Sequence, residues 1–590
     1  MSLKTGASES SHFRKAVMDH LLGMRDPDTG VWTGELSSSA LSTALTLVAL
    51  MKDPSCKDQT EASVAWLLAH QNGDGGWGDT SSSRSNLSTT LLVRSALRVV
   101  ERRRTSEVLC AALQQSDAWL VRKIGGISFP TLAKALQEIY QEDRTFAVPI
   151  LTFVAICEED VRLWKKIPAL PFLFALLPHS LYRFFKLEVV SYALPALIAI
   201  GMCRNRCRAG KWRGLTLSAL FAKPLLAKLE KLQPEHGGFL DATPLTAFVA
   251  VALEQMGYET HPVTQRAKAF LKASLRPDGS CAIDSNLRIW VTSLATRALL
   301  ACRDEQKFPR AEQERIARWL LSKQFQKTHP YTGAKAGGWA WTDCAGGVPD
   351  SDDTSGALIA LYHLKQQGVD VPVDDAVRAG LAWLRSVQNS DGGMPTFCKG
   401  WGRLPFDRSC PDISAHALLA FLYWKDLAVG AEETIERLLA YLMRTQCEDG
   451  SWIPLWFGNE ESALKLNPII GTARVLDALL QLLKAGHPCS PMIERMITQS
   501  IAFLLREQRP EGSWGAGTCG THEETGLAVI ALKKSTLPAA REAVVRGRRW
   551  LVEQGQNPVP APIGLYFSLL WYHEKMYPWV WTLEALAEND

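Results

Sequence analysis

The chain has 590 residues, of which 65 are Lys or Arg and 61 are Asp or Glu, so its formal net charge is only +4. This balance argues against a protein that coats nucleic acid, which needs a concentrated basic surface. Hydrophobic residues make up 47% of the chain, which excludes a disordered or collagen-like protein and allows large buried cores.

The N-terminal segment and the cysteines predict a reducing compartment. Residues 1–15 (MSLKTGASESSHFRK) lack the apolar segment of a secretory signal peptide. The 13 Cys are odd in number and include no Cys-x-x-Cys pair. We therefore expect a cytoplasmic protein whose thiols mostly serve as small hydrophobic side chains.

A short motif of the form Gln-x-x-x-Gly-x-Trp recurs along the chain. Complete copies are QNGDGGW (71–77), QCEDGSW (446–452) and QRPEGSW (508–514). Near copies begin at Gln233 and Gln388, and GGW at 337–339 keeps the ending without a Gln at the regular distance. The Gly, Asp and Pro residues form turns. Because Gln and Trp keep fixed positions in every complete copy, a simple turn between two helices explains the motif poorly.

The segments around the motif have the spacing of helices. Val64, Leu67 and Leu68 precede the first copy at i, i+3 and i+4, and apolar runs such as 355–364 (SGALIALYHL) follow later copies. Strand-like alternation is scarce, so we predict an all-α protein of repeated helix pairs. Such pairs stack into solenoids or closed rings, and apolar residues on both sides of many helices favour a closed α/α barrel.

Residues 167–203 form the most apolar stretch of the chain. Charged residues and four Pro interrupt it, so a transmembrane span is disfavoured. A basic segment, CRNRCRAGKWR, follows at 203–213. An apolar face bordered by basic residues suits insertion into one leaflet of an anionic membrane. A buried helix pair followed by a solvated loop explains the same sequence equally well.

The strongest chemical signal is GGWAWTDCAGGVPDSDDTSGALIAL at 337–361, in which Asp350, Asp352 and Asp353 lie within four residues. Capping of the following helix explains one of these carboxylates but not three. Packed carboxylates cannot all ionise at low cost, so we expect one of them to keep its proton with a raised pKa. Such a group is suited to act as a general acid.

A second polar pair follows in PFDRSCPDISAHALLAF. Asp412 and His416 are four residues apart and therefore share one face of the predicted helix. A single His on an apolar helix is more often a core residue than a catalytic one. The acidic cluster in the same predicted barrel makes a catalytic role more plausible.

These motifs together resemble those of the class II terpene cyclases, and within them the squalene–hopene cyclase family. The segment GGWAW…VPDSDDTSGA is similar to the family's Asp-x-Asp-Asp-Thr-Ala signature, and PDISAHAL is similar to its Asp-x-x-x-His helix. The Gln-x-x-x-Gly-x-Trp copies resemble the family repeat. The resemblance covers nearly the whole chain, and the combination of motifs in this order is highly specific.

The resemblance implies a role for each residue of the acid motif. Asp352 would be the proton donor, and Asp350 and Asp353 would shape its hydrogen-bond network. His416 would bond to the donor carboxyl and raise its acidity, while Asp412 would orient His416. The aromatic residues that would line the cavity and stabilise cations are Trp290, Trp341, Phe397, Trp456 and Tyr572.

The family also implies two α/α-barrel domains with a cavity between them. We place an N-terminal domain at 15–285 and a C-terminal domain, with the acid motif, at 286–590. By this analogy the stretch at 167–203 contacts the membrane, and the protein is a peripheral, monotopic protein on the cytoplasmic side. The expected partners are a polyprenyl hydrocarbon and a membrane surface, with no cofactor, metal or nucleic acid; a homodimer is left open.

The implied reaction is the cationic cyclisation of squalene, or a similar linear polyprenyl hydrocarbon, to a polycyclic triterpene. The chain departs from the family at Val291, where Asp is usual, and at Ala561 and Leu565, where hopene-forming enzymes carry Phe. We therefore expect fewer rings or another polyprenyl chain.

Three alternatives remain. They are a class II diterpene cyclase acting on geranylgeranyl diphosphate, a zinc-binding subunit like those of protein prenyltransferases, and a non-catalytic helical scaffold. The diterpene cyclase would need a Lys/Arg clamp near the cavity, and the zinc-binding subunit would use an Asp-x-Cys motif that this sequence lacks.

Overall fold

The protein is almost entirely helical. The computed structural model describes residues 2–140, 144–178, 181, 194–210, 214, 216–330, 332–398, 407–555, 558–565 and 570–588. Within these residues lie 23 α-helices and four short strands. The strands form two antiparallel hairpins, β1 (Met394–Pro395) with β2 (Ser409–Cys410) and β3 (Ile563–Leu565) with β4 (Leu570–Tyr572). The predicted all-α fold is therefore confirmed.

The C-terminal half forms a closed ring of six inner helices. Each inner helix contacts the next one in the chain, and the last contacts the first. The inner helices are α14 (Arg288–Ala301), α16 (Ser351–Gln366), α18 (Pro411–Tyr423), α20 (Pro468–Lys484), α22 (His522–Leu532) and α24 (Tyr577–Leu586). Around them lie α15 (Arg310–Ser322), α17 (Asp374–Val387), α19 (Ala431–Thr445), α21 (Pro491–Glu507) and α23 (Pro538–Glu553).

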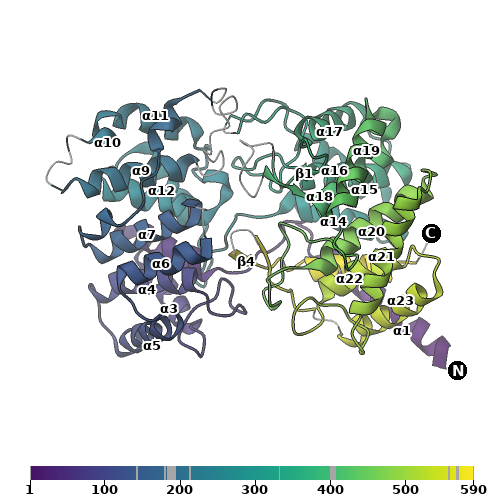
Figure 1. The fold of residues 1–590 in the computed structure, drawn as a ribbon, viewed down its shortest axis with the longest axis horizontal. Helices are drawn as coiled ribbons and strands as arrows, with labels where there is room; N and C mark the ends of the chain where they lie inside the picture. The colour runs from purple at the N-terminus through teal and green to yellow at the C-terminus, as the bar shows by residue number, and fades with distance from the viewer. Residues whose placement is uncertain are drawn as a thin grey trace.

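The N-terminal half forms a second ring, which closes within the described residues. Its inner helices are α2 (Ala40–Leu50), α4 (Leu87–Glu101), α7 (Arg144–Glu158), α9 (Leu194–Arg208) and α12 (Thr243–Gln255). Outside them lie α3 (Lys57–Ala69), α5 (Glu107–Ile124), α6 (Phe129–Tyr140), α10 (Leu217–Leu220), α11 (Ala222–Leu232) and α13 (Pro262–Ala273). The two rings form separate lobes with β4 between them (Figure 1).

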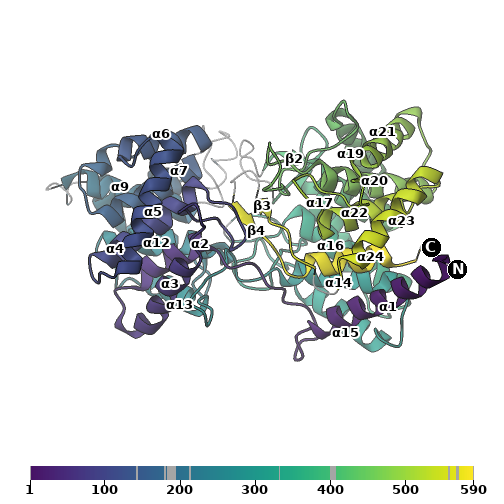
Figure 2. The same cartoon turned by 90° about the horizontal axis from the view of Figure 1, so that it is seen from below.

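The two lobes have separate hydrophobic cores, and the chain enters the C-terminal core first. One core joins buried residues of 13–36 to those of 282–586, whereas the other contains residues 40–271. Helix α1 (Ser2–Gly23) packs on α23 and α24 and lies along the C-terminal lobe (Figure 2). The boundary predicted from the sequence assigns residues 15–285 to the N-terminal domain. In the structure, buried residues of 13–36 belong instead to the C-terminal core, and α1 adds to the outer layer of the C-terminal barrel.

Each repeat motif ties neighbouring outer helices together. In the first copy, Trp77 Nε1 donates to the Leu67 carbonyl at the end of α3, 2.8 Å away. Gln71 Nε2 donates both to the Gly75 carbonyl and to the Ala112 carbonyl of α5, at 2.8 and 2.9 Å. Gly75 has φ 91°, a conformation that favours glycine. The motif is therefore a hydrogen-bonded joint and more than a turn.

In the copy at 337–339, the Gln lies farther away in the sequence than in the regular copies. Gln324 Nε2 donates to the Gly337 carbonyl at 2.7 Å and to the Ala376 carbonyl of α17 at 2.8 Å. The same two bonds form in the regular copies, so the twelve residues between Gln324 and Gly337 take the place of the three between Gln and Gly in a regular copy. A ten-residue loop, 340–349, separates Trp339 of this elongated copy from Asp350 of the acid motif.

The predicted membrane-contacting stretch is only partly described. Residues 179–180 and 182–193 lie outside the described residues, as do Lys211 and Arg213 of the basic segment. None of the helices in the described part of the chain is long and apolar enough to cross a bilayer.

Candidate active site

A cavity of about 280 Å³ lies between the two lobes. Residues of both cores line it, and most of them are apolar or aromatic. From the N-terminal lobe come Phe146, Pro149, Ala196, Leu240, Pro244, Leu245 and Phe248. The C-terminal lobe contributes the acid motif and the aromatic side chains. Such a mostly apolar space with a few placed polar groups is typical of a ligand site.

All five aromatic residues predicted from the sequence line this cavity: Trp290, Trp341, Phe397, Trp456 and Tyr572. Three of them form a continuous wall, because the Phe397 ring lies 6.0 Å from that of Trp341 and 5.3 Å from that of Trp456. The sequence reasoning missed four further aromatic residues in the lining: Phe146, Phe248, Phe457 and Tyr577. No motif marks these four residues.

The acid motif occupies the first turn of α16, at the end of the barrel that faces the cavity. Asp350, Asp352 and Asp353 all line the cavity. Asp350 caps the helix, since its Oδ1 accepts a hydrogen bond from the Asp353 amide at 2.8 Å. Its backbone also pairs with Trp339 and Phe397. The cap predicted for one of the three carboxylates is therefore Asp350.

Asp352 is bound by two basic side chains from neighbouring inner helices. His416 Nδ1 of α18 lies 2.6 Å from Asp352 Oδ1, and Arg474 Nη1 of α20 lies 3.4 Å from Asp352 Oδ2. The carboxyl is nearly enclosed, with 15% of the side chain exposed. The sequence predicted the His416 contact, but it did not identify Arg474.

Asp412 contacts different groups from those expected. The structure describes no hydrogen bond between Asp412 and His416. Instead, the fully buried Asp412 accepts a hydrogen bond from Cys410 Sγ at 2.7 Å, and its Oδ2 lies 3.9 Å from Arg474 Nη1. Arg474 thus bridges Asp352 and Asp412, and the expectation that Asp412 orients His416 directly is corrected. A lone Arg in the apolar helix sequence PIIGTARVL was the only signal for this bridge.

The three carboxylates of the motif differ in proton affinity. Burial opposes the ionisation of Asp352, but Arg474 and His416 outweigh it and hold its pKa below the ordinary value. Burial, with the charge of Asp352, raises the pKa of Asp350 to about 8. Burial and the charge of Asp350 raise the pKa of Asp353 well above its usual range. The raised pKa expected for the cluster thus falls on the two flanking residues.

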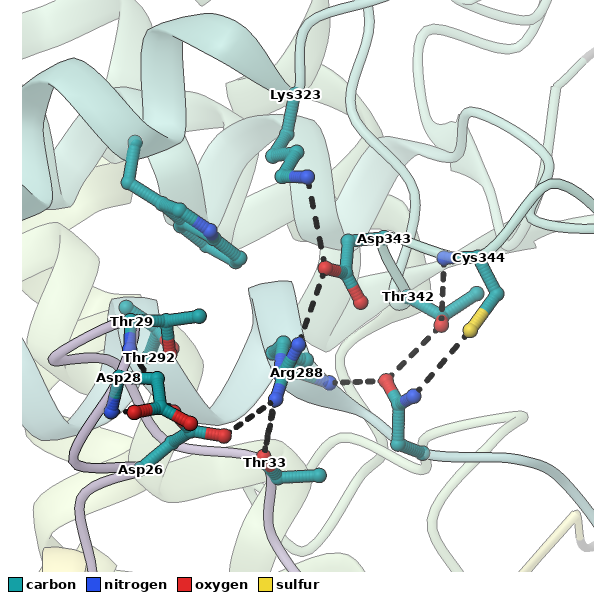
Figure 3. A network of polar contacts seen from close by, with 12 residues as sticks. Asp26, Asp28, Thr29, Thr33, Arg288, Thr292, Lys323, Thr342, Asp343 and Cys344 are labelled. Atoms are coloured by element: carbon teal, nitrogen blue, oxygen red, sulfur yellow. Dashed lines mark hydrogen bonds and ion pairs between the residues drawn. The ribbon is translucent and has the colours of Figure 1, made fainter.

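A cluster of charged residues positions the two Trp residues beside the acid motif. Arg288, in the first turn of α14, bonds to Asp26 Oδ2 at 3.0 Å and to Asp343 Oδ2 at 3.3 Å (Figure 3). The Trp341 carbonyl accepts hydrogen bonds from the amides of Ile289 and Trp290. The cluster therefore joins the N-terminal segment, the start of α14 and the loop that carries Trp341.

No group of three or more His, Cys, Asp or Glu side chains in the described ranges is arranged to hold a metal ion.

Comparison with known proteins identifies the family. The model of the squalene-hopene cyclase N-terminal domain matches residues 15–129, and the model of the C-terminal domain matches residues 287–524. Together they cover more than half of the chain. The chain belongs to the squalene–hopene cyclase family of class II terpene cyclases.

Curated relatives and a solved structure agree with this assignment. Dammaradiene synthase of Dryopteris crassirhizoma is 28% identical over 50% of this chain and 46% of its own length. Squalene–hopene cyclase of Alicyclobacillus acidocaldarius is 24% identical over 78% of this chain and 77% of its own length. Enfumafungin synthase of Hormonema carpetanum is 22% identical over 96% of this chain but only 47% of its own length. The chain thus spans about half the length of the dammaradiene and enfumafungin synthases.

The fold is shared with ent-copalyl diphosphate synthase from Streptomyces platensis. The two structures superpose with a TM-score of 0.59 at 19% identity, over 98% of this chain and 99% of the other. At this identity the match describes the fold alone.

Proposed function

We propose that this squalene–hopene cyclase family member cyclises a linear polyprenyl hydrocarbon, squalene or a similar chain, to a polycyclic triterpene. Asp352 starts the reaction by protonating a terminal double bond. The observation that carries the proposal is the position of the Asp352 carboxyl, which is held by His416 and Arg474 at the wall of an apolar, aromatic-lined cavity.

The protonation step requires an unusually strong acid, since an isolated alkene is a weak base. The alkene π electrons form a new C–H bond with the Asp352 proton, which leaves a carbocation on the chain and a carboxylate on the enzyme. Arg474 and His416 stabilise that carboxylate, so a protonated Asp352 is a stronger acid than an ordinary Asp. In a cavity that excludes water such charge interactions are strengthened.

The carbocations formed next need stabilisation without a nucleophile. Each subsequent ring forms when the next double bond of the folded chain attacks the cationic carbon. Aromatic faces stabilise a cation by about 0.5–2 kcal/mol each without forming a bond to it. Trp341, Phe397 and Trp456 supply such a wall, and the shape of the cavity holds the chain in position for ring closure.

The charge of the cavity favours a hydrocarbon over a diphosphate. Among the described residues that line the cavity, four are Asp and none is Lys or Arg. A substrate such as geranylgeranyl diphosphate would bring further negative charge to this surface without a partner. We therefore prefer the triterpene reaction to the diterpene alternative. The buried Asp352–His416–Arg474 contact, with a cavity beside it, disfavours a non-catalytic scaffold.

We also propose monotopic attachment to a membrane through the N-terminal lobe. Phe174, Leu217 and Leu220 are 43%, 49% and 74% exposed. They lie on elements that pack against α9 and α11, and α9 ends in the basic residues Arg206 and Arg208. Flotation with anionic vesicles tests this contact, which a Leu217→Ser/Leu220→Ser double variant is expected to weaken.

The experiment that tests the activity is incubation of the purified protein in detergent with squalene and, separately, with geranylgeranyl diphosphate. Mass spectrometry of the extracts is expected to show a cyclised isomer from squalene only. Hopene as the main product would contradict the expectation of fewer rings or another chain. Conversion of geranylgeranyl diphosphate alone would support the diterpene cyclase alternative. If neither substrate is converted, the proposed activity is contradicted.

A further inference from the structure

One carboxyl group in the cavity wall has no contact with the acid motif. Asp284 lines the cavity but lies in the segment between α13 and α14. No Lys or Arg forms an ion pair with it among the described residues. The other polar groups in the described lining, apart from the acid motif, are hydroxyls and indole N–H groups, which are much weaker bases than a carboxylate. Asp284 is therefore the strongest base of this lining outside the acid motif.

A chain of polar groups leads from Asp284 to the surface. The Ser285 amide donates to Asp284 Oδ1 at 2.7 Å, and the Ser285 hydroxyl donates to Asp241 Oδ1 at 3.2 Å. Asp241 is fully buried, and its Oδ1 lies 2.5 Å from Nε2 of His236. The His236 side chain is 31% exposed. Ser285 thus bonds to both carboxyls, through its amide to Asp284 and through its hydroxyl to Asp241, and His236 extends from Asp241 to solvent.

The backbone that carries Asp241 is strained. Leu240 and Asp241 have φ angles of 57° and 56°, in the left-handed region that non-Gly residues rarely adopt. Such strain costs about 1–3 kcal/mol for each residue and is concentrated at functional sites. Antiparallel pairing of Ala242 with Asp284 then holds the two segments side by side. The strained turn therefore brings Asp241 next to the segment of Asp284.

We propose that Asp284 accepts the proton that the last carbocation loses, and that Asp241 and His236 conduct this proton to the surface. This inference rests on the proposed cyclisation. A C–H bond next to the cationic carbon breaks, its electron pair forms the double bond of the product, and the proton binds to Asp284. One proton enters from Asp352 and one leaves through Asp284, so the product is an isomer of the substrate.

The charges around Asp284 fit this role. In the resting enzyme, burial and the charge of Asp241 raise the pKa of Asp284 well above its ordinary value. A carbocation beside Asp284 favours its ionised form, and the Asp284 proton then leaves for Asp241, where His236 and Ser285 hydrogen-bond to the carboxyl. Asp284 is then free to accept a proton, and Asp241 passes its own to His236.

The test compares Asp284→Asn with the wild-type enzyme on squalene, or on the polyprene that the wild type cyclises. Asn is isosteric and can still accept the Ser285 hydrogen bond, but it cannot serve as the base. We expect substrate protonation to continue, while the main wild-type alkene falls at least 10-fold and alcohols or other alkene isomers replace it. Asp278→Asn, in the same segment but outside the cavity lining, is the matched control and should keep the wild-type product profile.

A second variant keeps the test decisive if Asp284→Asn does not fold. Asp241→Asn blocks the onward path without touching the substrate, so the product should stay the same while steady-state turnover slows relative to the first turnover in a rapid-quench experiment. A slowing of both phases together would indicate a structural role and overturn the proposed path.

Two other results would overturn the inference while leaving the cyclase activity intact. One is a folded Asp284→Asn enzyme with the wild-type product profile, which would assign the final proton to Asp352 or to water. The other is a hydroxylated main product from the wild type, which would mean that water captures the cation. If the wild type cyclises no polyprene, the proposed function itself fails.

Discussion

His416 Nδ1 lies 2.6 Å from Oδ1 of Asp352, although 64 residues separate them in the chain. The contact exists because α16 and α18 are adjacent inner helices whose first turns face the cavity. It connects the acid motif to a second helix, and Arg474 connects it to a third. Four predictions test this acid motif and the repeat joints of the barrel.

Removal of the proton from Asp352 should abolish initiation. Asp352→Asn keeps the size of the side chain but cannot donate a carboxylic proton. Because a general acid contributes about 10²–10⁴-fold to a rate, we expect product formation to fall at least about 10²-fold, measured by mass spectrometry of the product over time. Asp374→Asn, at an exposed ion pair with Lys365, is the control and should retain full activity. A folded Asp352→Asn enzyme with unchanged turnover would exclude Asp352 as the acid.

Loss of Arg474 should destabilise the barrel as well as the acid. Arg474→Met leaves Asp352 and the buried Asp412 without their shared cation. Removing one partner of a buried ion pair costs about 3–5 kcal/mol, so denaturant unfolding should show a clear loss of stability. The double variant Arg474→Met/Asp412→Asn should recover part of it, because it removes one unpaired buried charge. No difference between the single and double variants would show that Asp412 does not depend on Arg474.

The raised pKa of Asp350 predicts a pH dependence of stability. The folded protein keeps this proton up to a pKa of about 8, whereas in the unfolded chain an Asp loses it near pH 4. The favourable contribution is therefore fully present below about pH 4 and is lost as the pH rises toward 8, by at most about 1.4 kcal/mol per pH unit.

Asp350→Asn removes this titration. Relative to the wild type, the variant should become progressively more stable between pH 5 and pH 8 in chemical unfolding followed by circular dichroism. A constant difference between the two proteins across this range would mean that Asp350 ionises normally in the folded state.

The indole hydrogen bond of the repeat should contribute measurably to stability. Trp452 is fully buried, and its Nε1 donates to the Leu442 carbonyl at 2.8 Å. Trp452→Phe removes the donor, leaves a buried carbonyl without that partner and creates space in the core, so we expect a loss of at least about 1–3 kcal/mol. Trp319→Phe, on outer helix α15 and only half-buried, should cost much less in the same unfolding assay. Equal losses would mean that the joint adds nothing beyond ordinary burial.

Much of the fold and part of the site could be predicted from local sequence patterns. Helical spacing around the repeats predicted the helix pairs, since such periodicity follows from which residues must be buried. The Asp350–Asp353 cluster and the i, i+4 pair Asp412 and His416 were recognisable because their members are neighbours in the chain. The predicted cavity aromatics were found through the resemblance to the family.

The tertiary structure alone decided which distant groups meet. Arg474 gives no local signal, yet it bridges Asp352 and Asp412 because three inner helices converge on the cavity. The packing of α1 on the C-terminal barrel and the use of Gln324 across an inserted segment depend on closing the ring of outer helices. The proton affinities of the three motif carboxylates also depend on burial and on charges brought from other helices, and these exist only once the barrel has formed.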